Sequence, residues 1–335
     1  MNVNINRRSF LLSGAAALVG GEGLAALPGK GAEGQAGRPR PAALDGPLAA
    51  ADSPLLKTVR FTRLEIAVGA ERPFKAVHCS DTHLNFMTVG DLLGARVQMD
   101  LAMYEGRRKQ HNPLAPFAAC VLKARQLNAP LLHTGDVWDY HGVANGLVAQ
   151  DAFAQAGDVF YAIGNHEMKG HWRTAPDFDT EKCRAWIQQY LPNPVLCAAR
   201  VIHGVNFVAF DDTGYSDARQ DEIDRFVRAE FAKGLPVVVM VHQPFLTDEI
   251  YGDLVEPKGQ LREHKPMPRK NFSGYLYGSK KRERQFVDWM LAQPNMKAVL
   301  CGHLHIEAQY RLSDTVVQYI AGAAMKGHAY EISFT

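Results

Sequence analysis

Short apolar runs alternate with amphipathic stretches along the chain from about residue 73 onward. Residues 74–80 (FKAVHCS) have the pattern of a strand, and residues 236–241 (PVVVMV) are apolar throughout, as in a strand buried on both faces. Residues 216–233 place Ile223, Val227 and Phe231 at helical spacing. Strands that alternate with helices in this way predict a layered α/β domain.

The same patterns predict the remaining elements. Helices are expected at residues 114–127, 143–154, 180–190 and 281–293, and strands at 130–134, 158–163, 201–210, 296–300, 307–312, 315–320 and 329–334. The alternation of apolar runs and amphipathic stretches is interrupted by two long, polar and irregular segments, residues 84–112 and 246–280. Long loops in a compact domain are usually functional or disordered, so these two are expected to form the walls of a substrate pocket.

The N-terminal segment has a different character. Arg7 and Arg8 precede a modest apolar stretch at residues 10–21 that Glu22 interrupts, so it is shorter than the ~20 apolar residues that span a bilayer. This pattern resembles a twin-arginine export signal, and the alternative is an unstructured terminus with a chance arginine pair. We therefore expect a signal peptide at 1–27, a flexible Pro/Gly/Ala-rich linker at 28–55, one domain at 56–335, no transmembrane span, and a periplasmic or secreted protein.

Composition narrows the class of protein. The 335 residues are 47% hydrophobic, which is typical of a globular protein, and 37 Lys and Arg nearly balance 35 Asp and Glu. This balance gives no general attraction to nucleic acid. The five cysteines form no CxxC pair, which argues against a zinc finger; a Cys183–Cys197 disulfide is conceivable in an exported protein.

Five short polar motifs each follow an apolar run and begin a loop. In chain order they are Asp81-Thr82-His83, Gly135-Asp136-Val137-Trp138-Asp139, Gly164-Asn165-His166-Glu167, Val241-His242 and Gly302-His303-Leu304-His305. Open α/β sheets bind ligands at the carboxyl ends of their strands. Oxygen and imidazole ligands suit Mn, Fe, Zn or Co, so the motifs predict a metal centre.

The series DxH, GDxxD, GNH[ED], H and GHxH resembles the calcineurin-like metallophosphoesterase family from Phe74 to the end of the chain. The resemblance implies a four-layer α/β/β/α sandwich of two mixed sheets and two metal ions bridged by Asp136. It assigns one ion to Asp81, His83, Asp136 and His305, and the other to Asp136, Asn165, His242 and His303. Asp139 stands where the iron-tyrosinate branch of the family has a tyrosine, so that type of centre is not expected.

The resemblance also implies a reaction. Two ions about 3.5–4 Å apart lower the pKa of a bridging water, and the resulting hydroxide attacks a phosphate ester. His166 would protonate the departing alkoxide, and Asp139 would hold the His166 ring in the right tautomer. A phosphodiester substrate is favoured, whether a small molecule, a lipid headgroup or a nucleotide; a phosphomonoesterase or protein phosphatase, a nuclease and a non-catalytic metal-binding scaffold are the alternatives.

Other charged positions leave two interpretations open. His78, His133 and His203 lie in strand-like segments and are expected to be packed in the core or hydrogen-bonded there. His141, His171 and His328 are either solvated loop residues or substrate contacts. The basic stretch at 258–282 either recognises phosphate or is a solvated loop.

Overall fold

The computed structural model describes residues 53–86, 112–140, 142–168, 180–213, 217–255 and 276–335. The predicted signal peptide at 1–27, residues 28–52 of the predicted linker, His141 and His171 lie outside these ranges. So do residues 87–111 and 256–275, which make up most of the two predicted pocket walls. No helix in the described ranges is both long and apolar enough to cross a membrane.

Two mixed sheets form the centre of the molecule. In spatial order the first has β1 (Arg60–Ile66), β11 (His328–Phe334), β2 (Phe74–Cys79), β3 (Leu131–His133) and β4 (Val159–Tyr161). The second has β5 (Cys197–Ile202), β6 (Val205–Phe210), β7 (Val237–Met240), β8 (Met296–Cys301), β10 (Val317–Ile320) and β9 (Ala308–Arg311). In the first sheet β2, β3 and β4 are parallel, and in the second β6, β7, β8 and β10 are parallel.

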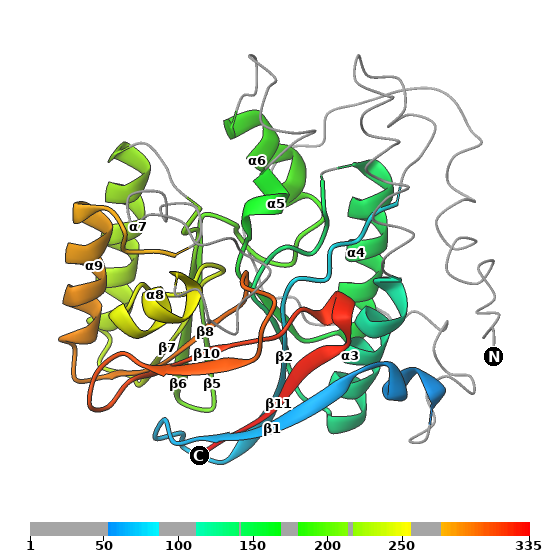
Figure 1. Ribbon diagram of the computed structural model, residues 1–335, viewed down its shortest axis with the longest axis horizontal. Helices are drawn as coiled ribbons and strands as arrows, with labels where there is room; N and C mark the ends of the chain where they lie inside the picture. Colours follow the sequence, from blue (N-terminus) through cyan, green and yellow to red (C-terminus); the bar gives the residue numbers. More distant parts are fainter. Residues whose placement is uncertain (1–52, 87–111, 141, 169–179, 214–216, 256–275) are drawn as a thin grey trace.

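Helices cover the outer face of each sheet (Figure 1). The helices beside the first sheet are α3 (Leu114–Leu127) and α4 (Val143–Ala156); those beside the second are α7 (Asp217–Phe231), α8 (Asp248–Val255) and α9 (Lys281–Leu291). The remaining elements are α5 (Asn165–Met168), α6 (Thr180–Gln188) and two 3-10 turns, η3 (Pro54–Thr58) and η6 (Ala324–Lys326).

Three hydrophobic clusters separate these layers. One includes Phe117 of α3 and Leu131 of β3, and another includes Val227 of α7 and Val239 of β7. The third joins residues of both sheets, such as Leu132 of β3 and Val238 of β7. Alternate residues of a strand point to opposite faces, so each central strand contributes to two clusters. This arrangement confirms the predicted four-layer α/β/β/α sandwich.

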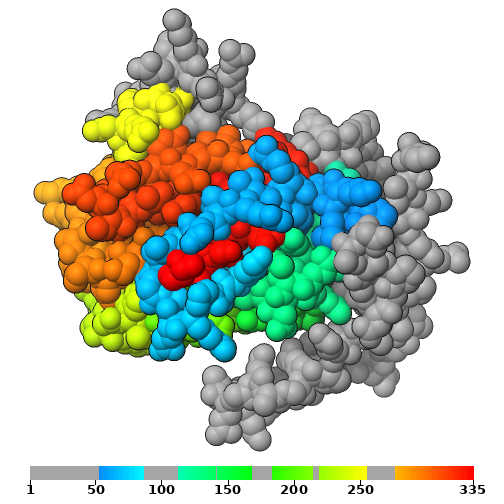
Figure 2. All heavy atoms as spheres, turned by 90° about the horizontal axis from the view of Figure 1, so that it is seen from below, coloured from blue at the N-terminus to red at the C-terminus, as the bar shows by residue number. Residues whose placement is uncertain are grey.

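The two ends of the described chain pair with each other. Strand β1 runs parallel to β11 from Arg60 opposite His328 to Ile66 opposite Phe334. Figure 2 shows β1 in blue beside β11 in red on one face of the molecule. Strand β1 was not predicted, because its short pattern lies before the regular alternation of apolar runs begins.

Two predicted segments differ in detail from the structure. The strand expected at residues 201–210 comprises the last two residues of β5 and all of β6, and the chain reverses between them at His203 and Gly204, which both have positive φ. A His-Gly turn lacks the usual asparagine or aspartate signal, so the sequence pattern concealed it. Helix α8 lies inside the segment 246–280 that was expected to be irregular.

The cysteines and three of the histidines can be compared with their predicted states. All five cysteines are free thiols, so the conceivable Cys183–Cys197 disulfide is absent from the structure. His78 and His133 are fully buried and hydrogen-bonded, as predicted. His203 lies half-buried in the β5–β6 turn, where its ring packs edge-on against Phe74 and accepts a hydrogen bond from Arg72.

Candidate metal centre

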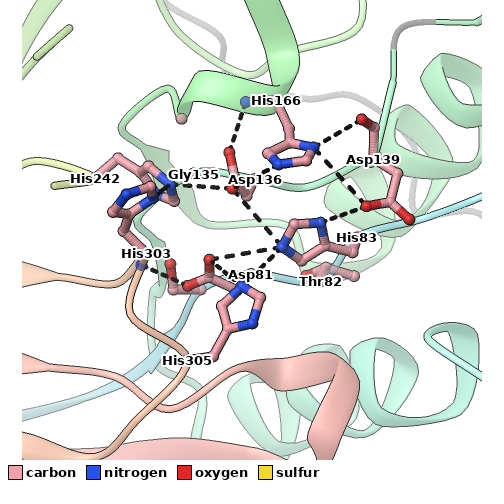
Figure 3. Close-up of polar contacts among 12 residues, drawn as sticks. Asp81, Thr82, His83, Gly135, Asp136, Asp139, His166, His242, His303 and His305 are labelled. Atoms are coloured by element: carbon pink, nitrogen blue, oxygen red, sulfur yellow. Dashed lines mark hydrogen bonds and ion pairs between the residues drawn. The ribbon is translucent and has the colours of Figure 1, made fainter. Parts of the chain in front are cut away.

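The five polar motifs meet at the carboxyl ends of central strands from both sheets. Asp81 and His83 follow β2, Asp136 follows β3 and Asn165 follows β4 in the first sheet. The second sheet contributes His242 after β7, and His303 and His305 after β8. Figure 3 shows the side chains of Asp81, His83, Asp136, His242, His303 and His305 converging on one region.

The backbone at these positions is unusual. Among the described residues other than glycine, seven have positive φ, and five of these are predicted ligands: Asp81, His83, Asp136, His303 and His305. Left-handed backbone is unfavourable for a residue with a side chain and recurs where function requires a particular orientation. At the ends of β2, β3 and β8 it turns successive side chains out of the strand direction and into the site.

Asp81, His83 and His305 form the first cluster that could hold an ion. The Nε2 atoms of His83 and His305 lie 3.1 Å apart, and Asp81 Oδ1 lies 3.2 Å from His305 Nε2 and 3.7 Å from His83 Nε2. Three potential ligand atoms therefore face one another across a short gap.

Asp136, His242 and His303 form the second cluster. His242 Nε2 lies 3.1 Å from both Asp136 Oδ2 and His303 Nδ1. The other ring nitrogen, His242 Nδ1, donates a hydrogen bond to the Thr134 carbonyl oxygen at 2.7 Å. Because Nδ1 carries that proton, Nε2 of the neutral ring presents a lone pair, which is the usual way in which a metal-binding histidine is oriented.

Asp136 lies between the two clusters (Figure 3). Its Oδ2 atom is 3.1 Å from His242 of the second cluster and 3.7 Å from His83 of the first. Its Oδ1 atom accepts a hydrogen bond from the His166 backbone N–H at 2.8 Å. Asp136 Oδ2 therefore faces the two clusters, while Asp136 Oδ1 is bound to the protein backbone.

Two buried oxygens test whether a cation fits. Asn165 Oδ1 accepts no hydrogen bond from the described residues, and Asp81 Oδ1 faces only the ring nitrogens of His83 and His305, although both side chains are buried. Buried polar atoms without a partner are rare and usually have a specific explanation. A cation would accept both oxygens, and oxygen with imidazole is a donor set that first-row divalent ions bind. The residues present therefore fit metal ions.

The charged side chains in the cluster region shift one another's pKa values. Burial opposes ionisation of Asp136, but the neighbouring His242 and His166 more than offset it and hold the pKa of this carboxyl well below its usual range. Burial likewise opposes protonation of His242, yet Asp136 raises its pKa to about 10. A cation in the second cluster would replace that proton as the partner of Asp136.

His166 lies beside the clusters and is held by the backbone. Its Nδ1 atom donates to the main-chain carbonyl of Asp139 at 2.8 Å, and its Nε2 atom lies 4.0 Å from Asp136 Oδ2. The bond to a carbonyl fixes the proton on Nδ1, so Nε2 is the atom that faces the clusters. Burial lowers the pKa of His166, with Asp136 opposing the effect.

The role expected of Asp139 needs correction. Its carboxylate Oδ1 lies 2.7 Å from His83 Nδ1 but 3.8 Å from His166 Nδ1. The carboxylate therefore orients the predicted ligand His83, while the main-chain oxygen of the same residue orients His166. Sequence spacing brings Asp139 to the site but does not show which of its oxygens meets which ring.

Two groups that support the site were not predicted from the sequence. The Thr134 carbonyl fixes the His242 ring, and no sequence pattern marks a backbone acceptor. Glu167 is fully buried, and its carboxylate accepts backbone N–H groups from the Asp136 segment. Glu167 was visible as the last residue of Gly-Asn-His-Glu, but its partners in the Asp136 segment are about thirty residues away in the sequence.

The α/β/β/α sandwich and its His/Asp clusters at the strand ends define the class of metal-binding phosphoester hydrolases. Residues 74–307 match the calcineurin-like phosphoesterase family, and the chain belongs to that family. No curated protein matches the chain in sequence.

Solved structures are similar in fold only. A dimetal phosphatase from Danio rerio is 11% identical, with a TM-score of 0.43, covering 76% of this chain and 88% of that one. A putative 5'-nucleotidase from Staphylococcus aureus is 15% identical, with a TM-score of 0.43 and coverage of 76% and 49%. A purple acid phosphatase from yellow lupin is 12% identical, with a TM-score of 0.45 and coverage of 77% and 45%. The chain thus spans about half the length of the last two.

Proposed function

We propose that this protein hydrolyses a phosphate ester with two metal ions, and that phosphodiesters are preferred to monoesters. The observation that carries the proposal is the position of Asp136 Oδ2 between two His/Asp clusters, 3.1 Å from His242 and 3.7 Å from His83. A shared carboxylate oxygen between two cations reduces their repulsion. Manganese, iron, zinc and cobalt are the candidate ions.

The chain's own residues have separable tasks in this proposal. When bound, the ions would polarise the phosphoryl oxygens and make a water between them more acidic. Asp81, His83 and His305 would hold one ion with Asp136, and Asn165, His242 and His303 would hold the other with it. His166 would supply a proton through Nε2 to the departing alkoxide, because its Nδ1 is committed to the Asp139 carbonyl.

Hydrolysis of matched esters tests this proposal. The wild-type protein, loaded separately with each candidate ion, is assayed on an aryl phosphodiester, the corresponding monoester and an alkyl diester. We expect faster cleavage of the diesters. We also expect His166→Ala to lower kcat by about 10²–10⁴-fold on the alkyl diester and less on the aryl esters, whose leaving groups need little protonation.

His203→Ala is the matched control, because His203 lies in the β5–β6 turn and outside both clusters. Its rates should equal those of the wild type. Preferential cleavage of the monoester would instead indicate a phosphomonoesterase or protein phosphatase. A wild-type protein that takes up no ion and cleaves none of the esters would refute the proposal.

We also propose that residues 1–27 direct twin-arginine export, which would place the enzyme in the periplasm or outside the cell. Support comes from the Arg7-Arg8 pair before the apolar stretch at residues 10–21. Replacing both arginines with lysine should retain the protein in the cytoplasmic fraction. Equal export of the variant and the wild type would contradict this proposal.

A further inference from the structure

Glu167 connects two of the predicted ligand segments. Its Oε2 atom accepts the backbone N–H groups of Gly164 at 2.7 Å and Asp136 at 3.0 Å. Its Oε1 atom accepts the N–H of Val137 at 2.5 Å and approaches that of Trp138 at 3.4 Å. One buried carboxylate therefore collects amides from both the Asp136 segment and the Gly164 turn.

The backbone is shaped to receive this carboxylate. The amides of residues 136, 137 and 138 are consecutive, and Asp136 has a φ of 53°. A left-handed residue in a turn directs successive N–H groups towards one point, which forms a concave site for an anion. In this molecule the carboxyl group of Glu167 occupies that site, and the N–H groups that it accepts hold the left-handed backbone of Asp136 in place.

The link between the segments works in both directions. While Glu167 accepts from the backbone of Asp136, the Oδ1 atom of Asp136 accepts the backbone N–H of His166 at 2.8 Å. We call these two sets of bonds the reciprocal pair. Because Oδ1 is occupied in this way, Asp136 directs Oδ2 to the clusters.

Gly164 makes the close approach possible. A Cβ atom on Gly164 would lie 2.3 Å from both the N and Oδ1 atoms of Asp136 and 2.9 Å from Glu167 Oε2. The two segments are thus in contact at the point where the reciprocal pair forms. A displacement of either segment must move the other.

We propose that Glu167 is a positioning residue that couples the metal centre to the proton donor. Glu167 fixes the backbone of Asp136, whose Oδ2 atom faces both clusters. Because Asp136 Oδ1 accepts the backbone N–H of His166, Glu167 also fixes the position of His166 relative to the clusters. The part of this inference that concerns ions and catalysis rests on the proposed function. The part that concerns the backbone does not.

Two substitutions test the inference on the full chain. Glu167→Gln keeps the size of the side chain but turns an NH₂ group towards backbone N–H donors. We expect manganese affinity and kcat each to fall about 10- to 100-fold, the range found when groups behind metal ligands are removed. The fall in kcat should be larger for the alkyl diester than for the aryl diester, since His166 is displaced. Glu167→Asp keeps the carboxyl group on a shorter side chain and should recover part of both losses.

Amide hydrogen exchange in the ion-free protein provides the second measurement. Exchange at residues 136–138 should accelerate in Glu167→Gln, while exchange in β8 should not change. Glu331→Gln is the matched control, because it removes another buried carboxylate, one that pairs with Lys75 and Lys123 away from the clusters. It should lower thermal stability without altering ion affinity or exchange at residues 136–138.

The outcomes separate the two proposals. Wild-type manganese affinity and unchanged exchange at residues 136–138 in Glu167→Gln would overturn the inference. If that variant does not fold, Glu167→Asp decides: faster exchange with weaker manganese binding supports the inference, and wild-type values for both overturn it. If the wild-type protein binds no ion, the proposed function fails, and the exchange comparison alone still tests the reciprocal pair.

Discussion

At the scale of single residues, strand-terminal position and spacing predicted which side chains gather at the site. Asp81 and His83, two residues apart, reach the same cluster because both have left-handed backbone. His303 and His305 have the same spacing and backbone conformation, but His305 belongs to the first cluster and His303 to the second. Spacing cannot show contacts made by backbone atoms. The division of Asp139 between His83 and His166 and the amides bound by Glu167 therefore came only from the structure.

A substitution at Gly302 tests whether the close packing around Asp81 determines ion binding by the first cluster. A Cβ atom at this position would lie 1.9 Å from Ser80 Oγ and 2.5 Å from Asp81 Oδ2. We expect Gly302→Ala to displace Asp81 and weaken manganese binding at least tenfold, as measured by calorimetry. The control is Gly252→Ala in α8, where an added Cβ atom would have no described atom outside its own helix within 4 Å, so an alanine should leave binding unchanged and stabilise the helix by up to about 1 kcal/mol. Equal manganese affinity in the two variants would contradict this explanation.

At the scale of elements, segments with a clear apolar pattern were predictable, including the short strands β3 and β4, whereas β1, α8 and the β5–β6 turn were not. Helix α3 occurs at the residues that its pattern indicated, whereas the β5–β6 turn was concealed by its apolar surroundings. Strands β2 and β3 carry His78 and His133 only three residues before Asp81 and Asp136. Burial lowers the pKa of both histidines from 6.5 to about 3, so both are neutral in the folded protein near pH 7.

This burial predicts how stability depends on pH. Between pH 6.5 and about 3 the unfolded chain protonates these histidines and the folded chain does not, so their contribution to the free energy of unfolding falls as the pH falls. In ion-free protein, His133→Gln should make that slope shallower by up to about 1.4 kcal/mol per pH unit, measured by urea unfolding from pH 6.5 to 4. Parallel slopes for the variant and the wild type would show that His133 is not held neutral.

At the scale of the whole molecule, the site depends on the packing of one sheet against the other. Alternating strands and helices indicated an α/β protein, but local periodicity cannot assign strands to one sheet or two. The family resemblance supplied that architecture, and the cluster joining Leu132 to Val238 shows how the sheets meet. Asp81 and Asp136 come from the first sheet and His242, His303 and His305 from the second, so each cluster contains residues of both.

The central claim is that these clusters bind two ions on either side of Asp136. Anomalous diffraction from crystals of the protein grown with manganese tests it most directly. We predict two peaks, one among Asp81, His83 and His305 and the other among Asp136, His242 and His303. We also predict that both peaks lie within bonding distance of Asp136. A map with no peak at these residues, or with a single peak in contact with only one cluster, would contradict the account.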